Sequence, residues 1–307
     1  MKRWKLIILG VLILFIVIVA VGVGGYIYIQ DSYNFTSSKD YPSLEKIELL
    51  DVAFDKVQKI NIALLGVDER KDDPGRSDAI IIVSLDLVNK KVNILSIPRD
   101  TRVLIPGKGY NKINHAYAYG GVNLSLKTIE DFLGIPIHYY AKVNFQDFEK
   151  LIDGLGGVDI EVEKRMYYRD KTDKFLVDLS PGVHHLNGKE ALGYVRFRHD
   201  IMGDLSRIER QQKFLKALFK QVKEKVTLLN LPQYVSLAGS TLETNVSLLE
   251  GVFIGSKFLN ITEDDINTMV LPGTPETIDG ISYVIPDEIK IRALVNENFK
   301  LSERKEE

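Results

Sequence analysis

The stretch YVRFRHDIMGDLSRIERQQ, residues 194–212, gathers four arginines, two aspartates and a glutamate in a chain whose formal net charge is −2. Guanidinium groups are planar and donate paired hydrogen bonds to phosphate oxygens, so several of them around one point suit a diphosphate. The stretch therefore predicts a local anion site. The alternative is an exposed surface on which these charges pair with one another.

Strand and helix geometry would bring these side chains together. In a strand, alternate residues share a face, which would place Arg196 and Arg198 side by side. In a helix, residues three and four apart share a face. A helix that begins near residue 204 would carry on that face Asp204, Arg207 and Gln211, with Arg210 beside them. We therefore expect a strand at 194–198, a turn, and a helix from Asp204, together forming a basic cleft.

A second set of charges lies in GVDERKDDPGRSDA, residues 66–79. Asp68 follows an apolar run typical of a buried strand, Asp78 opens the next strand, and Arg76 lies between them. Two carboxylates brought together repel each other unless a hard cation separates them, and magnesium is typically held by one or two carboxylates together with substrate phosphates. The pattern indicates a magnesium site, with a solvated acidic turn as the alternative.

A third set lies in SIPRDTRVLIPGKGYNKINHAYAYGG, residues 96–121. Pro98 ends the strand before it and turns the chain at the edge of the sheet. The charged side chains delivered there are Arg99, Asp100, Arg102, Lys108 and Lys112. For Arg102 and Lys108 a solvated loop remains a fair alternative, whereas Arg99 is the stronger candidate for the site.

The elements that must position these side chains follow from the apolar spacing. Continuous or alternating apolar runs predict strands, and spacing of three and four predicts helices. Strands are expected at 59–68, twice within 79–100 with a turn at Asn89-Lys90, and at 137–145, 158–163 and 267–272. Helices are expected at 123–134, capped by Asn123 or Ser125, at 144–154 and at 204–226. This alternation predicts a layered α/β fold with a mixed or parallel sheet, and we expect α-β-α layers around a mixed central sheet.

The N-terminus predicts a membrane anchor. Residues 6–29 carry no charge and would reach about 36 Å as a helix, enough to span a bilayer. The basic residues of MKRWK precede them, so the positive-inside rule keeps the N-terminus in the cytoplasm. A cleaved signal peptide is the alternative, with a weak cleavage match at residues 20–22. The expected parts are a cytoplasmic start (1–5), the anchor (6–29), an extracellular stalk (30–58), one catalytic domain (59–299) and a charged tail (300–307).

Several other functions are excluded by the sequence. The chain has no cysteine, which excludes disulfides, thiolate metal sites and a cysteine nucleophile. Its nearly balanced charge argues against a protein that coats nucleic acid. There is no HExxH and no GxSxG motif. GVHHLNGKE, residues 182–190, departs from a phosphate-binding loop in its glycine spacing and in having Glu190 where serine or threonine is needed.

Taken together, the segments NIALLGVDER with GRSDA, SIPRDTRVLIPGKGYNKINHAYAYGG and GKEALGYVRFRHDIMGDLSRIERQQ resemble the LytR/CpsA/Psr family of bacterial cell-wall phosphotransferases. The resemblance covers residues 59–223 strongly and the remainder to 299 loosely. It implies an enzyme that moves an anionic glycopolymer, such as wall teichoic acid, from an undecaprenyl diphosphate carrier to the C6 hydroxyl of N-acetylmuramic acid in peptidoglycan. It also implies an apolar tunnel for the lipid, enclosed by the sheet and helices, and a Gram-positive-type cell membrane.

The resemblance also assigns roles by position. The metal ligands, for Mg²⁺ with Mn²⁺ as an alternative, are Asp68 and Asp78. The diphosphate contacts are Arg99, Arg196, Arg198, Arg207 and Gln211, with Arg76, Arg102 and Arg210 as additions. The residues expected to be catalytic are Arg99, Asp204 and Arg207. Asp78, Asp100 and Asp204 compete for the role of general base. Two other functions use the same cleft: a polyprenyl-diphosphate pyrophosphatase, and a non-catalytic receptor or regulator that binds lipid-linked glycan.

Overall fold

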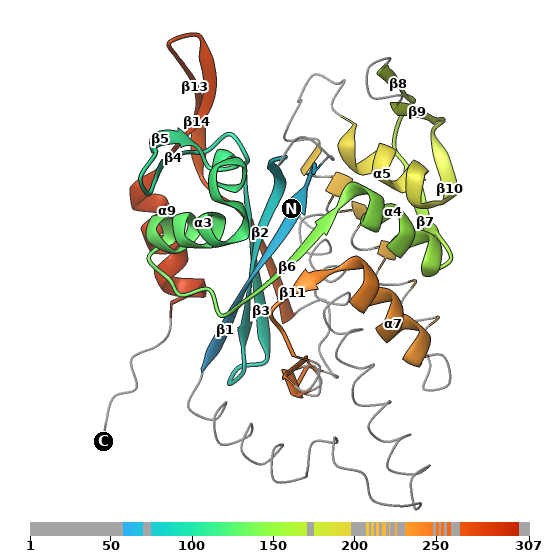
Figure 1. Ribbon diagram of the computed structural model, residues 1–307, viewed down its shortest axis with the longest axis horizontal. Helices are drawn as coiled ribbons and strands as arrows, with labels where there is room; N and C mark the ends of the chain where they lie inside the picture. The colour runs from blue at the N-terminus through green and yellow to red at the C-terminus, as the bar shows by residue number, and fades with distance from the viewer. Residues whose placement is uncertain are drawn as a thin grey trace, which may run out of the picture. The chain divides into compact units, whose positions relative to one another are not determined.

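The computed structural model describes residues 58–69, 75–170, 175–197, 231–247 and 265–300, and within 207–258 also positions 207, 208, 210, 211, 213, 214, 217, 218, 221, 225, 250, 251, 253, 254, 257 and 258. The chain divides into two compact units (Figure 1). The sheet unit comprises Phe54–Phe145, Glu243–Val246 and Asp265–Glu307. The other unit, called the α5 unit after its helix α5 (Gly188–Arg196), comprises Met1–Ala53, Gln146–Leu242 and Ser247–Asp264. The domain expected at 59–299 therefore draws on both units.

A six-stranded sheet forms the centre of the sheet unit, in the order β11-β6-β1-β2-β3-β12. Its strands are β1 Lys59–Val67, β2 Ser77–Asp86, β3 Lys91–Ile97, β6 Tyr139–Asn144, β11 Glu243–Thr244 and β12 Ile266–Val270. β1–β2, β2–β3 and β6–β11 are antiparallel, whereas β1–β6 and β3–β12 are parallel. The prediction of an α/β fold with a mixed central sheet is confirmed.

The first three strands form where the sequence predicts them. Their apolar side chains are buried on both faces of the sheet, as in Ile62 and Leu65 of β1. The expected turn between β2 and β3 is also present, because Asp86 Oδ1 accepts hydrogen bonds from the Val88 and Asn89 amides at 3.1 and 2.8 Å. The chain then reverses through Lys90, whose φ is 53°.

Two helices cover one face of this sheet, α3 (His115–Leu133) and α9 (Glu288–Asn298) (Figure 1). α3 ends at Gly134 as predicted, but it begins earlier than expected and neither Asn123 nor Ser125 caps it. The backbone breaks at Gly120 and Gly121, where Gly121 has φ 61° and ψ −152°. The helix predicted at 123–134 therefore corresponds to the segment after the break, and a further helical segment that begins at His115 precedes it. The remaining elements of the unit are two hairpins, β4 Arg102–Ile105 with β5 Gly109–Lys112, and β13 Gly273–Ile278 with β14 Ile281–Pro286.

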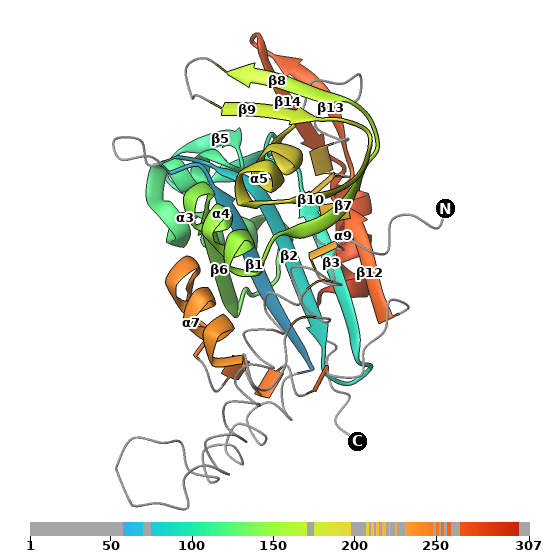
Figure 2. The same ribbon diagram turned by 90° about the vertical axis from the view of Figure 1, so that its right-hand side faces the viewer.

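The α5 unit contains helices and two strand pairs. The helices are α4 Phe145–Gly154, α5 Gly188–Arg196 and α7 Leu231–Thr241, and the strand pairs are β7 Val158–Val162 with β10 Gly182–Leu186 and β8 Met166–Asp170 with β9 Phe175–Leu179. In Figure 2 the two pairs follow one another as a long curved ribbon. The helix predicted at 144–154 and the strand predicted at 158–163 are confirmed, and the described positions between 207 and 225 are helical as expected.

The strand predicted at 194–198 is wrong, because residues 188–196 form α5. A capping box starts this helix: the Asn187 side chain accepts a hydrogen bond from the Glu190 amide, and the Glu190 carboxylate accepts one from the Asn187 amide, both at 3.0 Å. Arg196 is thus the last residue of a helix. Strand alternation does not pair it with Arg198, which lies outside the described residues.

The predicted anchor at 6–29 and stalk at 30–58 also lie outside the described residues, apart from residue 58. Within the part of the chain that the structure describes, no helix has the length and apolarity to cross a membrane.

Candidate functional site

The two predicted metal ligands lie at the same end of the β1–β2 pair. Pairing shifts from Gly66 with Ala79 to Val67 with Ser77, which leaves Asp78 without a cross-strand partner in a β-bulge. Bulges bend a strand and redirect side chains, and they are enriched beside active sites. The Asp68 amide donates to the Arg76 carbonyl at 3.1 Å and closes the loop at the ends of the two strands. The backbone therefore delivers both carboxylates to one edge of the sheet.

Arg99 joins this edge from the loop that follows β3. Its Nη1 atom lies 2.7 Å from Asp78 Oδ1, and its Nε atom lies 3.7 Å from Asp100 Oδ2. Lys112 Nζ lies 2.7 Å from the other oxygen of Asp100. These four side chains are between 19% and 28% exposed, so the ion pairs are shielded from water on most sides. The structure thus brings together four residues that the sequence placed at the edge of the sheet, Asp78, Arg99, Asp100 and Lys112.

His115 is a neighbour of this network that the sequence did not single out. Burial lowers its pKa, and the positive charges of Arg76 and Lys112 lower it further, against the opposing effect of Asp100. Both cations therefore act on the start of α3, where His115 stays neutral at physiological pH. The sequence offered no signal for His115, because the helix that begins at this residue was not predicted.

Arg102 makes a different kind of contact. Its guanidinium carbon lies 4.4 Å from the centre of the Tyr110 ring and 6.0 Å from that of Tyr283, within the range of cation–π interactions. Arg102 thus stacks on aromatic rings of the two hairpins, and its predicted diphosphate contact stays a prediction.

The carboxylates at this edge are donors of the type that magnesium prefers, and their role as its ligands stays a prediction. Among the described residues, no group of three or more histidines, aspartates or glutamates is close enough to hold a metal. Magnesium needs only one or two carboxylates when water and substrate phosphates supply the other ligands. Asp68 and Asp78 offer such a pair, and the Arg99 bond engages Oδ1 of Asp78.

The α5 unit contains the other predicted arginines. Arg210 is 2% exposed, and its Nε lies 2.8 Å from Glu163 Oε1 while its Nη1 donates to the Phe197 carbonyl at 2.6 Å. Tyr194 donates to the same glutamate at 3.1 Å, and burial, followed by the Glu163 charge, raises the pKa of Tyr194. These bonds give Arg210 a structural role at the end of α5, and its contact with a diphosphate stays a prediction.

The remaining candidates of this unit are described only in part. Arg196 ends α5, where a cation suits the negative end of the helix dipole. Arg207 is 6% exposed, and Gln211 donates to the Val195 carbonyl at 3.4 Å. Arg198 and Asp204 lie outside the described residues, so the structure does not test the proposed roles of these two residues.

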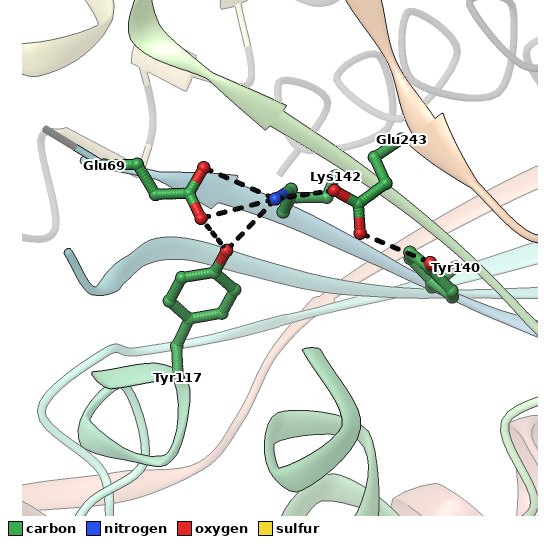
Figure 3. Close-up of polar contacts among 5 residues, drawn as sticks. All are labelled: Glu69, Tyr117, Tyr140, Lys142 and Glu243. Atoms are coloured by element: carbon green, nitrogen blue, oxygen red, sulfur yellow. Dashed lines mark hydrogen bonds and ion pairs between the residues drawn. The ribbon is translucent and has the colours of Figure 1, made fainter. Parts of the chain in front are cut away.

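A further charged cluster in the sheet unit was missed by the sequence reasoning. It comprises Glu69, Tyr117, Tyr140, Lys142 and Glu243 (Figure 3). Lys142 Nζ lies 2.7 Å from Glu243, 3.3 Å from Glu69 and 3.2 Å from the Tyr117 hydroxyl. Burial and the hydrogen bond to Glu69 raise the pKa of Tyr117 to about 12, so this hydroxyl stays protonated. Its members come from α3, β6, β11 and the loop after β1, which are far apart in the sequence, so no local motif indicated them.

The profile of the LytR_cpsA_psr family matches residues 26–300. The chain belongs to this family. Within it, the "Regulatory protein MsrR" of Staphylococcus aureus is 39% identical over 251 residues, which cover 80% of this chain and 75% of MsrR. The "Polyisoprenyl-teichoic acid--peptidoglycan teichoic acid transferase TagU" of Bacillus cereus is 33% identical over 300 residues, which cover 95% of this chain and 94% of TagU.

A solved structure of the LytR_cpsA_psr family has the same fold. TagT of Bacillus subtilis, solved with bound octaprenyl pyrophosphate lipid, superposes with a TM-score of 0.59 at 31% identity, over 78% of this chain and 89% of TagT. The family resemblance read from the three charged segments is therefore confirmed.

Proposed function

We propose that this member of the LytR_cpsA_psr family transfers an anionic glycopolymer, such as wall teichoic acid, from an undecaprenyl diphosphate carrier to the C6 hydroxyl of N-acetylmuramic acid in peptidoglycan. The observation that carries the proposal is the Arg99–Asp78 ion pair at 2.7 Å beside Asp68, in a chain that aligns with the transferase TagU over 95% of its length. TagT holds a polyprenyl pyrophosphate in the same fold, which supports a lipid-linked diphosphate as the donor.

The proposed reaction is a phosphoryl transfer. The acceptor hydroxyl oxygen forms a bond to the phosphorus that bears the glycan, the bond between this phosphorus and the bridging oxygen breaks, and undecaprenyl phosphate leaves. Positioning and charge stabilisation dominate the catalysis of such steps. Magnesium bound by Asp68 and Asp78 would neutralise charge on the diphosphate.

Arg99 supplies the fixed positive charge of the sheet unit in this proposal. Asp78 and Asp100 hold its guanidinium from two sides, so its orientation is set before the substrate binds. Asp78 pairs with Arg99, and Asp100 pairs with both Arg99 and Lys112. The proton of the acceptor hydroxyl must pass to a base, for which Asp78, Asp100 and Asp204 remain the candidates.

Two further parts of the proposal concern the lipid and the membrane. An apolar tunnel would receive the polyprenyl tail, as supported by the lipid bound to TagT. Residues 6–29 would anchor the chain in the cell membrane with the catalytic residues on the outer side.

The test uses the purified full chain in detergent with lipid-linked teichoic acid, magnesium and peptidoglycan oligomers. A covalent glycan–peptidoglycan product is expected, and Arg99→Ala should lower its rate about 100-fold because one charge-stabilising donor is lost. Lys91→Ala is the control, since it removes an ion pair with Asp265 at the opposite end of β3. Mass spectrometry of the product gives the readout.

Two outcomes of this assay would replace the proposal. Release of glycan phosphate at the same rate with and without peptidoglycan would identify a polyprenyl-diphosphate pyrophosphatase. Tight binding of the lipid-linked glycan with no product would identify a receptor or regulator, the class that the name "Regulatory protein MsrR" describes.

A further inference from the structure

Lys142 occupies the middle of three adjacent strands. On β6 it pairs in parallel register with Leu65 of β1 and in antiparallel register with Glu243 of β11. Its side chain is only 12% exposed. A shielded ammonium group costs free energy unless oxygen atoms surround it, so its partners define what this lysine does.

Its partners are three oxygen-bearing side chains from three other parts of the sheet unit (Figure 3). Lys142 Nζ lies 2.7 Å from the Glu243 carboxylate, 3.3 Å from both oxygens of Glu69, and 3.2 Å from the Tyr117 hydroxyl. Tyr117, which is 3% exposed on α3, donates its hydroxyl hydrogen to Glu69 as well. Glu69 is therefore held by two side chains at once, one from the sheet and one from a helix.

Glu69 directly follows Asp68, the candidate magnesium ligand, at the end of β1. On its other side, the Asp68 amide donates a hydrogen bond to the Arg76 carbonyl, and Gly75, whose φ is 73°, lies close to the Asp68 backbone. A Cβ atom at Gly75 would lie 2.1 Å from the Asp68 carbonyl oxygen. The backbone around Asp68 is thus confined by Gly75 and Arg76 on one side and by the bonds to Glu69 on the other.

We infer that Lys142 and Tyr117 are positioning residues that hold Glu69 and so fix the carboxylate of Asp68 for metal binding. This inference rests on the proposed role of Asp68 as a magnesium ligand. Some groups orient a metal ligand without touching the metal. Removing such a group weakens the affinity of the protein for the metal about 10-fold to 100-fold. The cluster contains two carboxylates and one ammonium, so its remaining negative charge also favours a nearby cation.

The test compares the full-length protein with Lys142→Met, Tyr117→Phe and Glu69→Gln. Titration of Mn²⁺ by calorimetry should show binding weakened about 10-fold in Lys142→Met, with a smaller loss in Tyr117→Phe. Turnover at saturating magnesium should stay close to that of the unchanged protein. Amide hydrogen exchange in a peptide covering residues 64–76 should become faster. Lys142→Arg, which keeps the positive charge beside Glu69, should restore most of the affinity.

Lys127→Met is the matched control, because Lys127 forms a 2.7 Å ion pair with Asp131 on the exposed side of α3. This variant should leave Mn²⁺ affinity and hydrogen exchange unchanged. Unchanged Mn²⁺ affinity in Lys142→Met would overturn the inference, whatever the exchange rate. If Lys142→Met does not fold, Glu69→Gln replaces it in both measurements, because glutamine keeps the shape of the Glu69 side chain and removes its negative charge.

The inference and the proposed function fail in different ways. Asp68→Asn tests the metal role directly. If it leaves Mn²⁺ affinity unchanged, the metal assignment of Asp68 is wrong and the inference falls with it, even when exchange at 64–76 becomes faster in Lys142→Met. If Asp68→Asn weakens binding and Lys142→Met does not, the metal assignment stands and Lys142 has no positioning role.

Discussion

At the scale of single residues, the arginines of this chain divide by what they touch. Arg99 is exposed enough to meet a substrate and is oriented by two carboxylates, whereas Arg210 is almost fully buried against Glu163 and the end of α5. The sequence ranked Arg99 above Arg210 but named both as diphosphate contacts, because residue type and spacing do not reveal burial. The structure separates a candidate for binding a diphosphate from a residue that stabilises the fold.

Arg210→Met should therefore destabilise the protein. The change leaves Glu163 and the Phe197 carbonyl without this donor, and the loss of hydrogen bonds to a charged group costs about 2 kcal/mol. Urea unfolding followed by circular dichroism gives the free energy of unfolding. Arg165→Met, which removes the exposed pair with Asp178, is the control and should change it by less than about 1 kcal/mol. Equal stability of the two variants would contradict the structural role of Arg210.

The residues that the sequence indicated differ from those that it missed in how far apart they lie along the chain. Asp68, Asp78 and Arg99 lie at the ends of three consecutive strands, so a local reading of the apolar runs placed them at one edge. Lys142 meets Glu243 only because β11 pairs with β6 across a long connection. The spacing of residues along the chain does not predict the pairing of β11 with β6, so the cluster could be found only from the structure.

At the scale of elements, the sequence predicted β1, β2 and β3 well because each is a continuous apolar run bounded by turn residues. The error at 194–198 has a definite cause: alternating apolar and charged residues suggested a strand, but the signal that decides the structure lies earlier, at Asn187 and Glu190. A capping box supplies two hydrogen bonds to the first turn, and six residues of the helix are buried. Side-chain alternation over five residues cannot outweigh them.

Asn187→Ala tests this account of α5. It should lower the free energy of unfolding by about 1 kcal/mol, because the Glu190 amide loses its acceptor. Asn187→Asp keeps an acceptor and should be nearly neutral, which makes it the matched control. Thermal unfolding of both variants gives the measurement, and an unchanged midpoint for Asn187→Ala would argue that tertiary packing alone sets the start of α5.

At the scale of the whole molecule, the proposed function requires that the catalytic residues lie outside the cytoplasm. The chain has no cysteine, so a single introduced cysteine reports its own position. Val183 is 78% exposed on β10 and suits this purpose. Val183→Cys in the full chain should react with a membrane-impermeant maleimide in intact cells. Labelling that appears only after the cells are permeabilised would contradict the predicted orientation.

The strand order of the sheet has a consequence for how the chain is made. β1, β2 and β3 are neighbours in sequence and form local pairs, but β12, which covers the outer side of β3, is among the last elements synthesised. Until then β3 is an unprotected edge, and such edges recruit other strands. A chain that stopped before residue 265 would therefore keep β3 uncovered, and aggregation or proteolysis, rather than loss of a catalytic group, would be its first defect.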